Sequence, residues 1–315
     1  MTEEVLTYQQ VTRYDPTRTT ALRNAFARQM EKRFDELIRV IQEAIVTNDC
    51  FGLKEQKVLT QQVTPPQYQA FAFLRDPAKV EAFMRWLQEQ VDKGILQVGV
   101  LEQVGSAVEQ AWTNMYVFDS YKRGVIRARY ELRKAGVQIP DDLFGGIEAS
   151  LSLPFHMDRV GLLYTRVFMD LKGITAAMDT MISRVLSQGM IDGDGPALLA
   201  RKLVAVINGE GVDKLGLRDS LGRFIPARTR AKILARTEII RAHAEAQLQE
   251  FRNWGVEGVS ALAEFSTAKD DRVCSICESL EGKVYTLDEA SGVIPVHPSC
   301  RCCWLPFIEE LQKYL

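Results

Sequence analysis

The sequence predicts a mainly α-helical protein, with a helical N-terminal body followed by a small α+β module that carries a Cys/His zinc-type site. Apolar residues recur every three or four positions through most of the first 208 residues, which is the period of amphipathic helices. After residue 255 the period changes to two, as in half-buried strands. Five of the six cysteines then fall within residues 270–306. We therefore expect a helical body over residues 1–215 and the module over residues 216–315.

The composition excludes several broad classes of protein. The apolar share of 46% and the charged share of 25% are typical of a globular chain, and a net charge of -2 gives no general attraction to nucleic acid or membranes. No run approaches the roughly 18 apolar residues of a membrane span, and the acidic start MTEEVLTYQQ does not resemble a signal peptide. We expect a cytoplasmic chain with no membrane partner. In that reducing compartment, clustered cysteines favour metal binding over disulfides.

The helical body is expected to hold a series of long helices joined by short turns. The first runs from Thr20 to Val46, where the apolar residues share one face. We interpret the aromatic and methionine stripes as core packing, His156 as a core or helix-start residue without a catalytic role, and Cys50 as a small buried residue. The next helices are expected over residues 77–94, 106–135, 156–188 and 196–208.

A locally basic segment opens the module. We expect a helix from about Thr229 to Trp254, in which Glu238 and Arg241 are three positions apart and can form an ion pair. The basic residues can contact phosphates or an acidic partner, or they can form a solvated helix face, and both interpretations stay open. The residues proposed to contact double-stranded DNA are Arg223, Arg228, Arg230 and Lys232.

Two short strands are expected after this helix. In VSALAEFST, Val259, Ala261, Ala263 and Phe265 alternate with more polar positions, as in a strand with one buried face. The stretch EGKVYTL is the second strand, and it begins after the turn-forming residue Gly282. Together with the preceding helix, these strands predict a compact α+β module.

The cysteine cluster has the spacing of a zinc site. Cys274 and Cys277 are two residues apart, which lets two thiolates face one ion, and HPSCRCC follows after a gap of 19 residues. A zinc ion would fasten a small sheet that has little core of its own and would contribute folding energy directly. Cys303 is the expected spare thiol. The expected ligands are Cys274, Cys277 and Cys300, with His297 or Cys302 as the fourth.

The same donor set argues against catalysis. A catalytic zinc needs an open coordination position and a nearby base, whereas a site with this many thiolates is normally closed. Asp270, Asp271 and Glu278 are near enough in the sequence to be considered as bases. The sequence contains no G-x-S-x-G turn, H-E-x-x-H helix or phosphate-binding glycine loop. We therefore expect a protein that is not an enzyme.

The order of motifs from residue 229 to 307 resembles the C-terminal domain of the phage Mu F-like family of minor head proteins, also called phage head morphogenesis proteins. The resemblance lies in ARTEIIRAHAEAQ, DDRVCSIC, LEGKVY and IPVHPSCRC, taken in this order. The recurring family positions correspond here to Arg236, Thr237 and Glu238, to Cys274 and Cys277, and to His297, Pro298, Cys300, Arg301 and Cys302.

The resemblance implies a minor capsid protein of a tailed phage or prophage. Such a protein associates with the portal vertex during procapsid assembly in the host cytoplasm, and it assists DNA packaging or ejection. Its implied partners are the portal protein and a major capsid or scaffolding protein, and its implied location is the virion head. The alternative from another class is a metal-dependent enzyme that acts on nucleic acid, or a transferase that uses Arg236 and Glu238.

Overall fold

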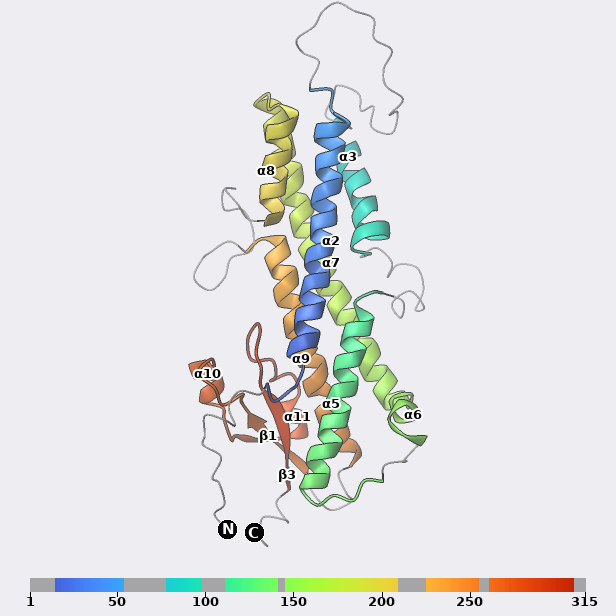
Figure 1. Cartoon of the computed structure of the whole chain (residues 1–315), viewed down its shortest axis with the longest axis vertical. Helices are drawn as coiled ribbons and strands as arrows, with labels where there is room; N and C mark the ends of the chain where they lie inside the picture. Colours follow the sequence, from blue (N-terminus) through green and yellow to red (C-terminus); the bar gives the residue numbers. More distant parts are fainter. Residues whose placement is uncertain are drawn as a thin grey trace, which may run out of the picture. The chain divides into compact units, whose positions relative to one another are not determined.

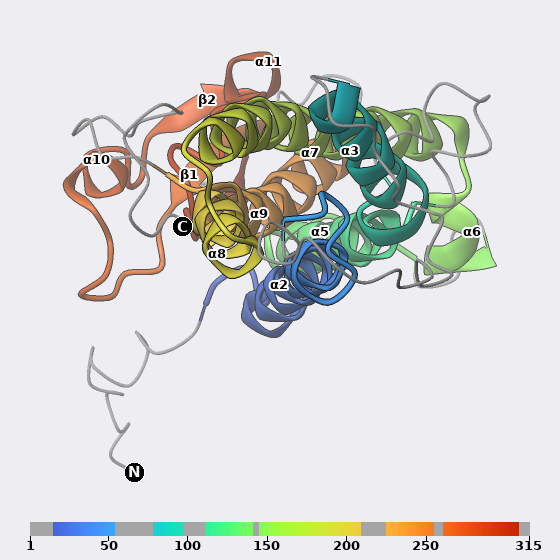
Figure 2. The same cartoon turned by 90° about the horizontal axis from the view of Figure 1, so that it is seen from above.

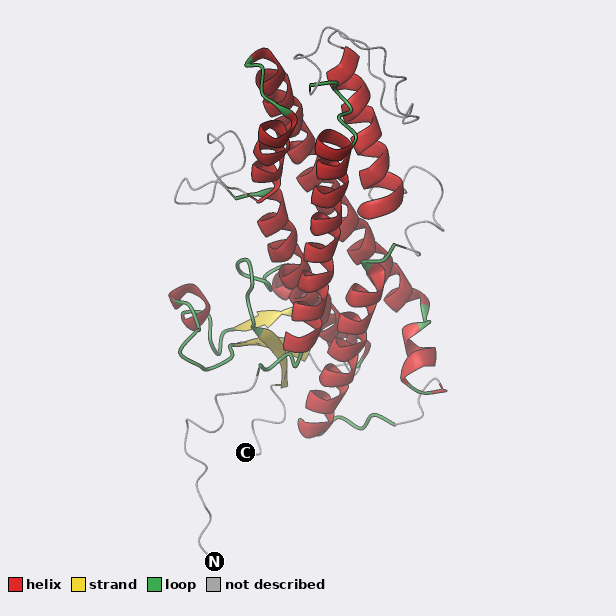
Figure 3. Ribbon diagram, turned by 45° about the horizontal axis from the view of Figure 1, so that its top comes forward, coloured by secondary structure: helices red, strands yellow, loops and turns green. Residues whose placement is uncertain are grey.

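The structure is a computed structural model that is mainly helical (Figure 1, Figure 3). It divides into two compact units, each built from separate parts of the chain. The sheet unit contains residues 1–27, 108–167 and 233–315, and the helical unit contains residues 28–107 and 168–232. The structure describes residues 15–53, 78–97, 111–140, 145–208, 225–254 and 261–308.

The helices follow the predicted periodicity closely. Two of the predicted helices end in π-helical turns, η1 (Glu43–Thr47) and η3 (Gln90–Ile95). No helix in the described ranges is long and apolar enough to cross a membrane. The α-helices are α2 (Thr20–Gln42), α3 (Ala78–Glu89), α5 (Asn114–Lys134), α6 (Ile147–Leu151), α7 (Pro154–Ile191), α8 (Pro196–Asn208), α9 (Ala227–Asn253), α10 (Ser275–Glu278) and α11 (Leu287–Ala290).

The sheet unit contains a three-stranded antiparallel sheet in the order β2-β1-β3 (Figure 3). The strands are β1 (Ala261–Ser266), β2 (Val284–Thr286) and β3 (Cys303–Ile308). Phe265 pairs with Trp304 in register, and their rings form an edge-to-face contact with centroids 5.6 Å apart. The first two strands were predicted, but β3 was not, because its first residues were interpreted as the end of the cysteine cluster.

Helices α5 and α9 complete the core of the sheet unit. Ala128 and Leu132 of α5 and Phe251 of α9 belong to the same buried cluster as Phe265 and Trp304 of the sheet. The structure therefore divides the chain differently from the predicted boundary between residues 215 and 216. The physical reason is that the small sheet buries its apolar face against a helix from the part of the sequence expected to form a separate body.

Two close contacts set the approach of α5 to α9. The hydroxyl of Ser120 donates a hydrogen bond of 2.6 Å to the carbonyl of Ile239. Gly124 lies one turn further along α5, where a β-carbon would stand 2.4 Å from the carbonyl oxygen of His243. Both views in Figures 1 and 2 place α10 beyond the sheet from α5, at one margin of the unit.

Candidate metal centre

The first cysteine pair is set by the short helix α10. Cys274 is its N-cap residue with extended backbone, and the Cys274 sulfur accepts a hydrogen bond of 3.4 Å from the backbone N–H of Cys277. This is the usual way a side chain satisfies a free N–H at a helix start. The turn brings both sulfurs to one side of α10, with Cys277 buried and Cys274 half-buried.

The second group comes from the loop between α11 and β3. The backbone N–H of Cys300 donates to the carbonyl of His297 at 3.1 Å, and Ser299 between them has a positive φ of 64°. The backbone N–H of Ser299 donates to the hydroxyl of Thr237 on α9 at 3.2 Å. Helix α9 therefore holds the loop that presents the histidine and the later cysteines.

The donor atoms of α10 and those of the loop before β3 lie close together. The Nε2 atom of His297 is 3.2 Å from the sulfur of Cys274 and 3.2 Å from that of Cys277, and the sulfurs of Cys277 and Cys300 are 3.9 Å apart. For a tetrahedral ion with Zn–S of about 2.3 Å and Zn–N of about 2.0 Å, these separations would be about 3.5 Å and about 3.8 Å. These three separations therefore agree with a tetrahedral site, in which Cys277 is the residue close to both His297 and Cys300.

The histidine is oriented for this role. Its Nδ1 atom lies 2.9 Å from the carbonyl oxygen of Pro298, and because a carbonyl only accepts, Nδ1 carries the proton. The neutral ring then presents the lone pair of Nε2 to the sulfurs of Cys274 and Cys277. Metal-binding histidines in proteins commonly use a backbone carbonyl in this way to fix the ring and its tautomer.

All five predicted ligands lie in two overlapping groups of three, and Cys277 belongs to both. Within each group the ligand atoms lie within 4.8 Å of one another. Cys303 and Cys50 belong to neither group among the described residues, as expected for a spare thiol and a small buried residue. The groups are Cys274, Cys277 and His297, and Cys277, Cys300 and Cys302.

The thiols differ in their tendency to ionise. The hydrogen bond with Cys302 lowers the pKa of Cys300 to about 5, and the same bond raises the pKa of Cys302. Burial raises the pKa of Cys277 to about 12. The pKa of Cys274 is lowered, because its sulfur accepts a hydrogen bond from the backbone N–H of Cys277. Since cysteine ligands bind a metal as thiolates, a metal ion would release protons when it binds here.

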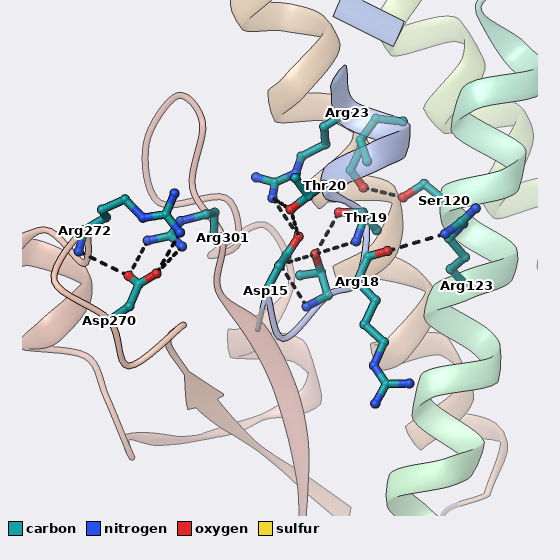
Figure 4. Close-up of polar contacts among 12 residues, drawn as sticks. Asp15, Arg18, Thr19, Thr20, Arg23, Ser120, Arg123, Asp270, Arg272 and Arg301 are labelled. Carbon is teal, nitrogen blue, oxygen red and sulfur yellow. Dashed lines mark hydrogen bonds and ion pairs between the residues drawn. The ribbon is translucent and has the colours of Figure 1, made fainter. Parts of the chain in front are cut away.

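A carboxylate beside the cysteines is engaged by two arginines. Arg301 makes two hydrogen bonds of 2.6 and 2.5 Å to Asp270, and Arg272 adds one of 2.9 Å (Figure 4). The hydrogen bond from Arg301 is the main reason that the pKa of Asp270 lies well below its usual range. A carboxylate held in this way is a poor proton acceptor, so Asp270 does not meet the requirements of a general base.

Glu238, which the alternative transferase hypothesis would use, is 3% exposed. It lies 3.1 Å from Arg241, which confirms the predicted ion pair, and 3.4 Å from Arg166 of α7. Because Glu238 is buried and paired with these two arginines, we interpret it as a residue that stabilises the packing of α7 and α9.

The basic segment is partly neutralised within the chain. Arg228 pairs with Asp35 at 2.7 Å and Lys232 pairs with Glu31 at 2.7 Å, both inside the helical unit. Burial lowers the pKa of Arg230. Arg223 lies outside the described residues. The solvated-face interpretation therefore describes Arg228 and Lys232 only in part, because both side chains are held by carboxylates.

Two features near the site were not predicted from the sequence. One is the contact of Thr237 with the loop at Ser299, and the other is the clamp between Arg301 and Asp270. The position of Arg301 between Cys300 and Cys302 is the one sequence feature that could have indicated that Arg301 lies near the site. Neither contact follows from local spacing, because each joins residues more than 30 positions apart.

Comparison with known proteins identifies one family. Residues 180–305 match the family model described as Phage Mu protein F like protein. The matched segment contains the whole Cys/His group and all of α9, and it confirms the resemblance expected from the motifs. It also extends the similarity beyond the motifs, to α8 and the end of α7. No curated protein and no solved structure matches the chain.

Proposed function

From the similarity of residues 180–305 to the phage Mu F-like family, we propose that this chain is a minor capsid protein of a tailed phage or prophage. In this proposal it acts in head morphogenesis, is located in the virion at the portal vertex or head interior, and assists DNA packaging or ejection. The family match is the observation that carries the proposal. Its proposed partners are the portal protein and a major capsid or scaffolding protein.

We further propose that the Cys/His group holds a structural zinc ion. The proposed four-ligand set is Cys274, Cys277, His297 and Cys300, in which Cys277 joins the first group to Cys300 through a sulfur separation of 3.9 Å. When bound, zinc would supply a cross-link between α10 and the loop before β3. In this proposal His297 is the fourth ligand, and Cys302 is a hydrogen-bond partner of Cys300 instead of a ligand.

A closed set of three thiolates and one imidazole leaves no position for a substrate. Together with the engaged carboxylates Asp270 and Glu238, this supports an assembly role over a metal-dependent enzyme. A contact between the basic segment and double-stranded DNA would have to compete with the ion pairs of Arg228 and Lys232.

The assembly role is tested by counting the protein in particles. The chain is co-expressed with the portal and shell proteins of its own source, and purified particles are analysed by quantitative mass spectrometry. We expect a small and reproducible copy number that disappears when the portal is omitted. Particles that lack the protein in the presence of the portal would refute the proposed role.

The metal proposal is tested separately by elemental analysis of the purified full-length chain. We expect one zinc ion per chain in the wild type, in Cys302→Ala and in the control Cys50→Ala. The ion should be lost in Cys277→Ala and in His297→Ala. Zinc retained in His297→Ala but lost in Cys302→Ala would exchange the roles of these two residues. A wild-type chain without metal would refute the site and leave the assembly role to the particle experiment.

A further inference from the structure

A small groove lies in the sheet unit, away from the Cys/His group. It is formed by the turn before α2 and the outer face of α5, and its volume is about 320 Å³. Ile126 and Tyr130, one turn apart on α5, are 47% and 56% exposed and present neighbouring apolar surfaces beside the groove. The groove is lined by Thr17, Arg18, Arg123, Ile126, Arg127 and Tyr130.

The charge on this groove is positive and only partly compensated. Arg123 pairs with Asp119 at 3.0 Å, and Arg127 pairs with Glu131. No residue in the described ranges forms an ion pair with Arg18, and Figure 4 shows its side chain pointing away from the surrounding polar contacts. No described carboxylate lines the groove. Arg18 therefore leaves one guanidinium unpaired beside two exposed apolar side chains.

The backbone under Arg18 is held in place. Its φ is 52°, in the left-handed region that residues other than glycine seldom adopt. The turn is closed by a hydrogen bond of 2.9 Å from the N–H of Arg18 to the carbonyl of Asp15. Arg123 also donates to the carbonyl of Arg18 at 3.4 Å, which joins the turn to α5 (Figure 4). A turn fixed in this way loses little freedom when it binds a partner.

The lining distinguishes between two kinds of anionic partner. The guanidinium of Arg127 lies over the ring of Tyr130 at 5.4 Å, so one face of the ring is already covered and less available to stack a nucleotide base. A single uncompensated cation is also too few for a phosphate backbone, which is bound by many cationic contacts. A carboxylate next to an apolar side chain matches both the free guanidinium and the exposed Ile126 and Tyr130.

We propose that this groove binds a short segment of a partner protein in which an aspartate or glutamate stands next to an aliphatic or aromatic residue. The carboxylate pairs with Arg18, and the neighbouring side chain packs on Ile126 and Tyr130. The proposal goes beyond the assembly role and the metal site, and it can fail while both of them stand.

Selection from a display library of short random peptides on the full-length chain tests this proposal. We expect enriched peptides that place an acidic residue next to Leu, Ile or Phe. A synthetic enriched peptide should bind Arg18→Gln at least about tenfold more weakly than the wild type, since a charged pair is lost. Ile126→Ser should also weaken binding. Arg184→Gln, an exposed arginine on α7, is the control and should bind like the wild type.

Several outcomes would overturn the proposal. They are a library without enrichment, enriched peptides without acidic residues, and equal affinity of the enriched peptide for Arg18→Gln and the wild type. A short single-stranded oligonucleotide is tested in parallel. If it binds the wild type and Arg18→Gln loses that binding, the groove recognises phosphate and the peptide proposal is wrong. Melting temperatures of the variants, measured by calorimetry, show whether any loss of binding reflects unfolding.

Discussion

Single buried side chains decide how α5, α7 and α9 pack in the sheet unit. Glu250 of α9 is fully buried and accepts hydrogen bonds from Arg129 at 3.0 Å, His156 at 2.9 Å and Trp254 at 2.7 Å. The other ring nitrogen of His156 lies 2.9 Å from the hydroxyl of Tyr121. His156 is therefore a core residue, as expected from the sequence, and the network satisfies each of these buried polar groups.

Replacing Glu250 by Gln should destabilise the sheet unit by about 3 kcal/mol at neutral pH, because Arg129 would keep a buried charge without its partner. Burial alone would raise the pKa of Glu250, but hydrogen bonds from His156 and Arg129 lower it overall. The carboxylate therefore adds stability above its unfolded pKa of about 4.3, and this is lost as the pH falls through the lower folded value. Urea denaturation at a series of pH values measures the difference, which should shrink in acid.

The control for this comparison is Glu148→Gln. Glu148 pairs with Lys122 at the surface and is 65% exposed, so its loss should change stability by less than about 0.5 kcal/mol. Equal effects of the two substitutions, or a Glu250→Gln effect that does not depend on pH, would contradict the assigned role of the buried network.

Gly124 is needed for the close approach of α5 to α9. A β-carbon at this position would lie 2.4 Å from the carbonyl oxygen of His243 and 2.7 Å from the β-carbon of Ala246, so Gly124→Ala should cost about 1–3 kcal/mol. Gly161 of α7 faces open space, and Gly161→Ala should be neutral or stabilising by up to about 1 kcal/mol. Thermal unfolding measures the stability of both variants. A stabilising effect of Gly124→Ala would show that α5 and α9 do not approach each other as described.

At the scale of elements, the sheet unit depends on contacts between short segments far apart in the chain. Helix α10 and the loop before β3 carry the cysteines, and neither is long enough to be stable alone. The hydroxyl of Thr237 on α9 fixes the loop at Ser299, and the Arg301 to Asp270 pair connects that loop to the segment before α10. Helix α9 thus acts as the support on which the proposed metal ligands are assembled.

Removing the hydroxyl of Thr237 should loosen the loop and weaken zinc binding. Residues that orient metal ligands commonly change affinity by 10- to 100-fold, so we expect Thr237→Val to bind zinc about tenfold more weakly. Thr237→Ser keeps the acceptor oxygen and should retain wild-type affinity. Competition with a chromophoric chelator measures both constants. Unchanged affinity in Thr237→Val would mean that the loop is positioned without this hydrogen bond.

At the scale of the whole molecule, both compact units are discontinuous in sequence. The sheet unit draws on residues 1–27, 108–167 and 233–315, and the helical unit on the two segments between them. Neither unit corresponds to a continuous stretch of chain. This organisation explains why a single boundary near residue 215 does not separate the helical parts from the sheet.

A fragment of residues 216–315 should therefore fail to fold by itself. It lacks Ala128, Leu132 and Ile139, which share the core with the sheet, and a typical net stability of about 5–15 kcal/mol does not survive the loss of a whole packing face. We expect no cooperative thermal transition by circular dichroism, even with zinc, whereas the full-length chain should show one. A cooperative transition of the fragment would restore the predicted module as an independent domain.

Local patterns were sufficient to predict the helices, two strands and the members of the Cys/His group. Helix and strand periods are set by neighbours within a few positions, and the spacing of Cys274 and Cys277 limits how their thiols can point. The motif order also indicated the family that residues 180–305 match. These properties are carried by short stretches of chain, so they can be read without knowing the fold.

The remaining features depend on packing between segments that are distant in sequence. The strand β3, the shared core of α5 with the sheet, the Glu250 network and the contact of Thr237 with Ser299 all join residues far apart along the chain. Their partners are chosen by the burial of apolar surface and the satisfaction of buried polar groups, which only the folded chain brings about. For this reason the sequence indicated the members of the Cys/His group, whereas the fold determined which segments support them.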